Sequence, residues 1–227
     1  MRLLLFDIDG TLLSCGGQPK PLFAEALVEV FGETGDIDGY DFSGKTDPQI
    51  VVELLAGAGH AREAVLDGVP RVRDAYLDRL ERALDPEGIR ILPGVVELLE
   101  TLAARTDVAL GLLTGNWERG AGIKLGRAGL GRYFDFGSFG DGWTNRRDLP
   151  PVALRLAETR HGRRFPPEES WIIGDSPLDV DCARAHGLRC LGVATGRSST
   201  ADLTAAGATH AVDDLRALPE IVARLLA

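Results

Sequence analysis

The sequence predicts the α/β fold class, with a doubly wound parallel sheet and an inserted α-helical segment. Three observations support this prediction. Short apolar runs recur along the chain without the alternation typical of half-exposed strands, and helical patterns separate them. One long segment near the start has helical patterns and no convincing strand. Alternating strands and helices are typical of a parallel sheet covered on both faces.

Four apolar runs are expected to be strands, and a fifth, weaker run joins them. The strong runs are residues 3–6, 108–113, 171–173 and 190–193, and the weaker one is 134–139. Between the first two strong runs, apolar residues recur at helical spacing over residues 95–103, after Pro93 and Gly94. We expect the runs to form one sheet.

Residues 17–85 interrupt the alternation immediately after the first strand. Helical patterns cover residues 22–31, 50–55 and 69–84, and the Gly- and Pro-containing stretches CGGQPKP and DPEG flank the segment. We therefore predict a core domain of residues 1–16 and 86–227, with residues 17–85 as a helical cap domain.

Composition and charge exclude several functional classes. The formal net charge of -9 over 227 residues disfavours binding to nucleic acid or to an anionic membrane surface, and no stretch is apolar enough for a membrane span. Three cysteines without a CxxC pair are typical of thiols in a reducing compartment. We expect a cytoplasmic protein, and its oligomeric state stays open.

Polar residues gather where three of the predicted strands end. The stretches concerned are Asp7-Ile8-Asp9-Gly10-Thr11, Thr114-Gly115-Asn116 and Gly174-Asp175-Ser176, with Asp179 one turn further on. Ligands bind beyond the carboxyl ends of the strands in an open parallel sheet. These residues are therefore the candidate site.

The aspartates at these strand ends require a cation. Two carboxylates about 5 Å apart at an effective dielectric near 20 repel by roughly 3 kcal/mol. Oxygen ligands without nearby His or Cys favour Mg²⁺, which also allows an acidic pocket to accept an anionic substrate.

These motifs resemble the signature of the haloacid dehalogenase superfamily of Mg²⁺-dependent phosphotransferases. DIDGT resembles its motif I, Thr114 of LLTGN its motif II and GDSPLD its motif IV, and the similarity covers essentially the whole chain. The resemblance implies a Rossmann-like core with a helical cap inserted after motif I, as in the phosphoglycolate phosphatase-like members.

The resemblance also implies a role for each matching residue. Asp7 would attack phosphorus and form an aspartyl-phosphate, while Asp9 would act as general acid and base. Asp7, the backbone carbonyl of Asp9 and Asp175 would hold Mg²⁺, and Asp179 would support these ligands. The Thr114 hydroxyl would bind phosphoryl oxygens together with backbone groups of Gly10, Gly115 and Asn116.

One motif departs from the family pattern. Motif III usually supplies a Lys a few residues before a Pro, and the matching stretch here is TNRRDLPPVAL. The best alignment assigns this role to Arg147, with Arg146 as the close alternative. Arginine offers a planar fork that can still bind phosphate.

Residues 39–46, GYDFSGKT, match the phosphate-binding loop pattern GxxxxGK[ST] by coincidence. That loop must follow a buried strand, whereas FGETGDID precedes this stretch. We instead expect Lys45 to lie in a cap loop that faces the site, where it would bind the non-reacting end of the substrate.

The predicted function is hydrolysis of a small organic phosphomonoester, of the phosphoglycolate or sugar-phosphate type. The partner would be a small phosphorylated metabolite, and Asp9 disfavours dehalogenation because a halide leaves without a proton. Two alternatives stay open: a phosphomutase of the β-phosphoglucomutase type, and a non-catalytic phosphate-binding regulatory protein on the same scaffold. An intact set of Asp7, Asp9, Thr114 and Asp175 argues against the latter.

Overall fold

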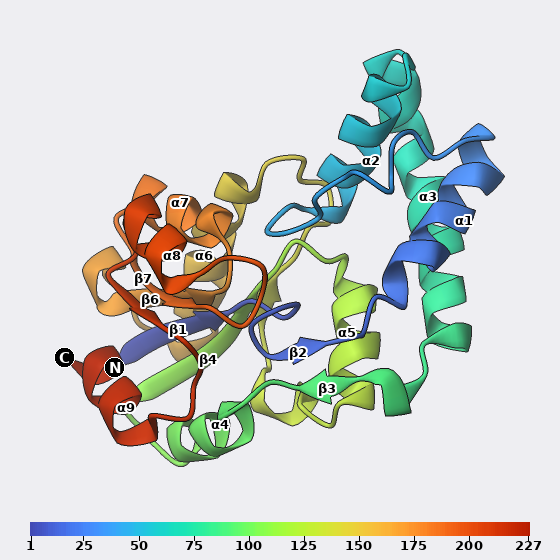
Figure 1. Ribbon diagram of the computed structural model, residues 1–227. Helices are drawn as coiled ribbons and strands as arrows, with labels where there is room; N and C mark the ends of the chain where they lie inside the picture. Colours follow the sequence, from blue (N-terminus) through green and yellow to red (C-terminus); the bar gives the residue numbers. More distant parts are fainter.

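A six-stranded parallel sheet forms the centre of the computed structural model, which describes residues 1–227 (Figure 1). The strands are β1 (Arg2–Phe6), β4 (Val108–Leu113), β5 (Gly137–Ser138), β6 (Ser170–Gly174), β7 (Arg189–Val193) and β8 (His210–Val212). Their order across the sheet is β5-β4-β1-β6-β7-β8, and every neighbouring pair is parallel. The doubly wound α/β class is therefore confirmed.

Helices cover both faces of the sheet. They are α4 (Val95–Ala103), α5 (Glu118–Arg127), α6 (Leu149–His161), α7 (Pro177–Ala185), α8 (Thr200–Ala206) and α9 (Leu218–Leu226). Leu3 and Leu5 of β1 belong to a buried cluster with side chains of α6, α7 and α8. Leu4 and Phe6 belong to a second cluster with side chains of α4, α5 and α9. Successive residues of β1 thus face different helical layers, which explains its unbroken apolar run.

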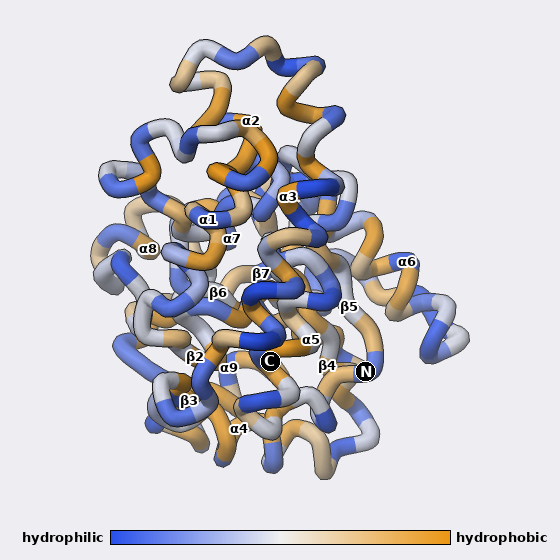
Figure 2. Tube along the Cα trace, turned by 90° about the vertical axis from the view of Figure 1, so that its right-hand side faces the viewer, coloured by the Kyte–Doolittle hydropathy of each residue, from blue (hydrophilic) through white to orange (hydrophobic).

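Three further helices lie apart from the sheet: α1 (Pro19–Phe31), α2 (Asp47–Gly57) and α3 (Arg62–Ala83) (Figure 1). Both α1 and α2 pack on α3. The view turned by 90° shows α2 at the far end of the molecule from α4 (Figure 2). A short antiparallel ribbon, β2 (Leu13–Ser14) with β3 (Arg90–Ile91), joins the chain segments that lead to and from these helices. The domain boundaries at residues 16 and 86 stay a prediction.

The remaining elements are short. The 3₁₀ helices are η1 (Pro86–Gly88), η2 (Gly131–Tyr133), η3 (Arg146–Asp148) and η4 (Pro167–Glu169).

All three cysteines are buried and unpaired. None of the helices has the combination of length and apolar composition that crossing a membrane requires.

Candidate active site

A cavity of about 330 Å³ lies between the carboxyl ends of the strands and helices α1 to α3. Its lining includes Asp7, Asp9, Gly10, Thr114, Gly115, Asn116, Arg146 and Asp175 from the sheet side, and Lys20, Phe23, Phe42, Lys45, Asp47, Ile50 and Tyr76 from the other side. Most of the predicted site residues therefore share one cavity, while Asp179 and Arg147 are not part of its wall: those in the wall are Asp7, Asp9, Gly10, Lys45, Thr114, Gly115, Asn116 and Asp175.

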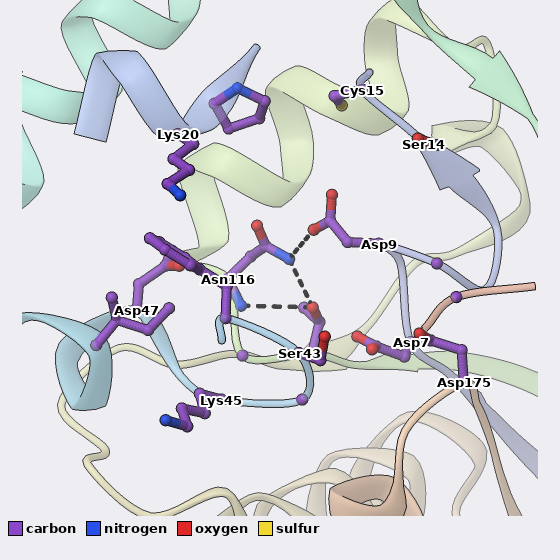
Figure 3. A pocket seen from close by; sticks show the side chains of 18 of the residues that line it. Asp7, Asp9, Ser14, Cys15, Lys20, Ser43, Lys45, Asp47, Asn116 and Asp175 are labelled. Atoms are coloured by element: carbon purple, nitrogen blue, oxygen red, sulfur yellow. Dashed lines mark hydrogen bonds between the residues drawn. The ribbon is translucent and has the colours of Figure 1, made fainter. Parts of the chain in front are cut away.

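Three buried aspartates form a cluster at one end of the cavity, and two of them, Asp7 and Asp175, line its wall. Asp7 follows β1, Asp175 follows β6, and Asp179 lies in the first turn of α7. One carboxylate oxygen from each lies within 4.8 Å of the other two. Figure 3 shows Asp7 and Asp175 next to each other at the edge of the pocket. The sheet topology thus creates the acidic cluster, because β1 and β6 are hydrogen-bonded neighbours.

Burial and mutual repulsion raise the pKa values of two aspartates in the acidic cluster. Burial raises the pKa of Asp7 to about 6, with Arg146 opposing the shift and Asp179 adding to it. Burial also raises the pKa of Asp175 to about 8, and the charges of Asp179 and Asp7 reinforce it. A divalent cation would relieve this repulsion, and the oxygen-only donor set suits a hard cation.

Close packing fixes the position of Asp175. A Cβ atom at Gly10, whose φ is +85°, would lie 2.4 Å from Asp175 Oδ2, and one at Gly196 would lie 1.7 Å from the same oxygen. The Thr11 hydroxyl also donates to Asp175 Oδ1, at 3.3 Å. Glycine at both positions therefore leaves room for the carboxylate in the cluster.

Arg146, not Arg147, lies beside the acidic cluster. Arg146 Nη2 is 3.2 Å from Asp7 Oδ1 and 2.6 Å from Asp179 Oδ1, and the Arg146 side chain is only 5% exposed. The Arg147 side chain is 55% exposed and pairs with Asp181. The prediction that placed Arg147 in the site is therefore wrong. Both residues belong to η3, where three residues complete one turn, so adjacent side chains point in different directions.

Both oxygens of Asp179 have partners within the protein. Oδ2 accepts hydrogen bonds from the Ser176 backbone N–H and from its hydroxyl, which forms a capping box at the start of α7. Oδ1 pairs with Arg146. Asp179 is therefore placed to orient Arg146 and the N-terminus of α7.

Asp9 points away from the acidic cluster. Its Oδ2 accepts hydrogen bonds from Asn116 Nδ2 at 2.8 Å and from Lys124 Nζ at 2.6 Å. Asn116 Nδ2 also donates to Thr114 Oγ1 at 2.8 Å. The hydrogen bond between Asn116 and Asp9 is visible in Figure 3. Asp9 is not a member of the three-aspartate cluster. The resemblance gives the metal only the backbone carbonyl of Asp9, and the Asp9 side chain points toward Lys124 of α5.

Two residues of this cavity were missed by sequence reasoning, Lys124 and Asp47. Lys124 is buried on α5, where Ala121 and Leu125 of the same helix are also buried. A lysine in the apolar stripe of an amphipathic helix was the available signal. Asp47 begins α2, and its carboxylate accepts a hydrogen bond from the Trp117 N–H at 2.8 Å. Burial raises the pKa of Asp47 to about 7, with Lys124 opposing.

Residues 44–47 contact the loop that follows β4. The Asp47 N–H donates to Gly115 O at 2.8 Å, and a Cβ at Gly115 would lie 2.0 Å from the Lys45 carbonyl oxygen. Arg146 Nη1 donates to Gly44 O at 3.3 Å. Lys45 itself lies over the Tyr40 ring and pairs with Glu53 at 2.8 Å. Helix α2 is thereby held against the strand ends.

Comparisons with known proteins agree with the motifs. A sequence model of the family described as haloacid dehalogenase-like hydrolase matches residues 4–184. A protein of Pseudomonas putida named phosphoglycolate phosphatase is 28% identical over 222 residues, which cover 96% of this chain and 78% of that protein. Phosphoglycolate phosphatase 1 of Pseudomonas aeruginosa is 30% identical over 224 residues, with the same coverage of 96% and 78%.

The fold also has a close counterpart among solved structures. The crystal structure of a hydrolase from Pseudomonas syringae aligns with a TM-score of 0.69 and 23% identity, covering 100% of both chains. At this identity the likeness concerns the fold. Together with the family match, it confirms the resemblance that the motifs predicted.

Proposed function

The chain belongs to the haloacid dehalogenase-like hydrolase family, and we propose that it is a Mg²⁺-dependent phosphatase that hydrolyses a small organic phosphomonoester through an aspartyl-phosphate at Asp7. The observation that carries this proposal is the juxtaposition of Asp7, Asp175 and Arg146 at one end of the cavity. In a protein that only binds phosphate, a buried carboxylate at this position would be unfavourable, because the carboxylate would repel the anionic ligand.

The acidic cluster fits a hard divalent cation. Asp7 and Asp175 would hold the metal, together with the backbone carbonyl of Asp9, and Asp179 would support them through Arg146. When bound, Mg²⁺ would neutralise charge on the phosphoryl oxygens and so let an anionic ester approach Asp7.

The side chains then divide the reaction into two displacements. In the first, an Asp7 oxygen forms a bond to phosphorus while the bond between phosphorus and the ester oxygen breaks, and Asp9 gives a proton to the leaving alcohol. In the second, Asp9 takes a proton from water, whose oxygen bonds to phosphorus as the bond to Asp7 breaks. Phosphate is released and both aspartates return to their starting state.

The Thr114 hydroxyl is suited to bind a phosphoryl oxygen. Its oxygen accepts hydrogen bonds from Asn116 Nδ2 at 2.8 Å and from the Asn116 N–H at 3.4 Å. Because the oxygen accepts both bonds from Asn116, the hydroxyl hydrogen is not used there and can be donated to a ligand. Thr114 is part of the cavity wall. The backbone N–H of Gly115 would add a further donor, whereas the Gly10 N–H donates to the Leu13 carbonyl oxygen at 2.9 Å.

The substrate is a small phosphorylated metabolite, and phosphoglycolate is the first to test. The two Pseudomonas relatives carry the name phosphoglycolate phosphatase and match nearly the whole chain. Lys20 and Lys45 line the far side of the cavity, where they would attract the non-reacting end of the substrate (Figure 3). We propose that residues 17–85 act as the cap that closes over this substrate. Three free thiols are compatible with a reducing cytoplasm.

A panel of small phosphomonoesters tests the proposal. Phosphate release is measured for phosphoglycolate and for several sugar phosphates, with and without Mg²⁺, for the parent enzyme and Asp7→Asn. We expect release only with metal and only from the parent. Metal-independent release, or an Asp7→Asn variant as active as the parent, would overturn the mechanism.

The same panel separates the alternatives. If sugar phosphates are isomerised and no ester is hydrolysed, the phosphomutase alternative is correct. If esters bind but neither reaction occurs, the chain is a phosphate-binding protein on this scaffold.

A further inference from the structure

Lys124 is a buried cation that the proposed reaction does not use. Its side chain is only 5% exposed, yet it lines the same cavity as Asp7 and Asp9. Lysine is rarely buried to this degree without a partner, because its charge must leave water. An apolar residue would suit the buried stripe of α5 better, so the lysine calls for an explanation from its contacts.

Those contacts form a closed network around one carboxylate oxygen. Lys124 Nζ donates to Asp9 Oδ2 at 2.6 Å and to Asn116 Oδ1 at 2.7 Å. Asn116 Nδ2 donates to the same Asp9 oxygen at 2.8 Å. Lys124 and Asn116 thus fix each other and also fix Asp9.

The network leaves the second oxygen of Asp9 free. Both hydrogen bonds that the carboxylate accepts go to Oδ2, from Asn116 and Lys124, and the Asp9 side chain is 42% exposed within the cavity. Without these two donors, an aspartate at a strand end could adopt several rotamers. With them, Oδ1 is the oxygen available to exchange a proton.

The charge of Lys124 is maintained in this environment. Burial acts to lower the pKa of Lys124, but the charge of Asp9, together with smaller contributions from Tyr76, Cys15 and Asp47, raises the pKa above its usual value. Arg146 cannot replace Lys124, because Arg146 Nη2 is committed to Asp7 and Asp179. The two cations therefore serve different aspartates.

We propose that Lys124 is a positioning residue which, together with Asn116, holds Asp9 so that its free oxygen faces the leaving group of the substrate. This inference rests on the proposed function, in which Asp9 acts as general acid and base. A misplacement of about 1 Å can cost on the order of a hundredfold in rate, so the loss of Lys124 affects turnover more than substrate binding.

The test compares Lys124→Met, Lys124→Arg, Asp9→Asn and the Asp9→Asn/Lys124→Met double variant on the best alkyl phosphate of the panel. We expect Lys124→Met to lower kcat by at least tenfold with little change in KM, and Lys124→Arg to recover part of that loss. Because Lys124 acts through Asp9, the double variant should be no slower than Asp9→Asn alone. Arg127→Met, which removes a cation of the same helix outside the cavity, is the matched control.

The rate of the first displacement on p-nitrophenyl phosphate is a second measurement, and it stays interpretable even when part of the variant protein is unfolded. Its leaving group departs without a proton, so the rate of the initial burst in Lys124→Met should match that of the parent, while steady-state turnover is slow. Partial unfolding would lower the burst amplitude and leave its rate unchanged.

Each contrary outcome has a distinct meaning. A kcat equal to that of the parent, additive effects in the double variant, or a rise in KM alone would overturn the positioning role, and the last would indicate that Lys124 binds substrate directly. A parent that hydrolyses no ester would instead refute the proposed function, and this inference with it.

Discussion

Replacing Arg146 with methionine should destabilise the protein and abolish phosphate release, whereas replacing the adjacent Arg147 should do neither. Arg146 Nη2 lies 3.2 Å from Asp7 Oδ1 and 2.6 Å from Asp179 Oδ1. At an effective dielectric near 20, these contacts correspond to gross attractions of about 5 and 6 kcal/mol, largely offset by the cost of burying the guanidinium. Removing one member of such a buried pair leaves uncompensated charge and typically costs about 3 to 5 kcal/mol.

Urea unfolding of the metal-free variants at pH 8 measures this difference. We expect the free energy of unfolding to fall by about 3 to 5 kcal/mol in Arg146→Met, while Arg147→Met leaves the midpoint unchanged within error. Arg146→Lys should retain part of the stability and of the activity, because it keeps the charge and loses the fork. If Arg147→Met is as damaging as Arg146→Met, or if Arg146→Met is as stable as the parent, the assignment is wrong.

Two further predictions concern the carboxylates that would hold the metal. In the metal-free protein, the pKa of Asp7 is raised to about 6 and that of Asp175 to about 8, from 3.8, so the folded state keeps protons that the unfolded chain releases. The free energy of unfolding should therefore decrease by on the order of 3 kcal/mol between pH 6 and pH 8, and a flat or rising urea-denaturation profile would contradict this reasoning. Gly196→Ala should weaken Mg²⁺ binding by roughly 10- to 100-fold in calorimetry, because its Cβ displaces Asp175. Gly122→Ala, whose Cβ meets no atom within 4 Å, should bind Mg²⁺ like the parent, and equal affinities in both variants would refute the packing argument.

The strands of the sheet were predictable where hydrophobic burial alone determines them. The run at residues 108–113 coincides with β4, because helices cover that strand on both faces. Strand β8 was missed, since its three residues are only partly buried and begin with His210. The ribbon of β2 and β3 was missed for a related reason, because two residues per strand carry too little pattern to detect.

The candidate site, too, was predictable only in part. Asp7 and Asp175 could be identified because each follows an apolar strand, and the edge of a parallel sheet brings such residues together. The choice between Arg146 and Arg147 depended on the direction of side chains in a single 3₁₀ turn, which sequence does not reveal. Lys124 lies on the helix that follows Thr114, and its pairing with Asp9 needs the three-dimensional fold.

The most direct test of the central claim is acid quenching of the enzyme during turnover of a phosphomonoester labelled in its phosphoryl group. We expect a covalently labelled protein whose label is removed by hydroxylamine, as for an acyl phosphate, and maps to the peptide that contains Asp7. The label should be absent from Asp7→Asn. Turnover of labelled p-nitrophenyl phosphate without any trapped label in Lys124→Met, in which only the second displacement should be slow, would contradict the role of Asp7 as nucleophile. Label retained in Asp7→Asn would contradict it too.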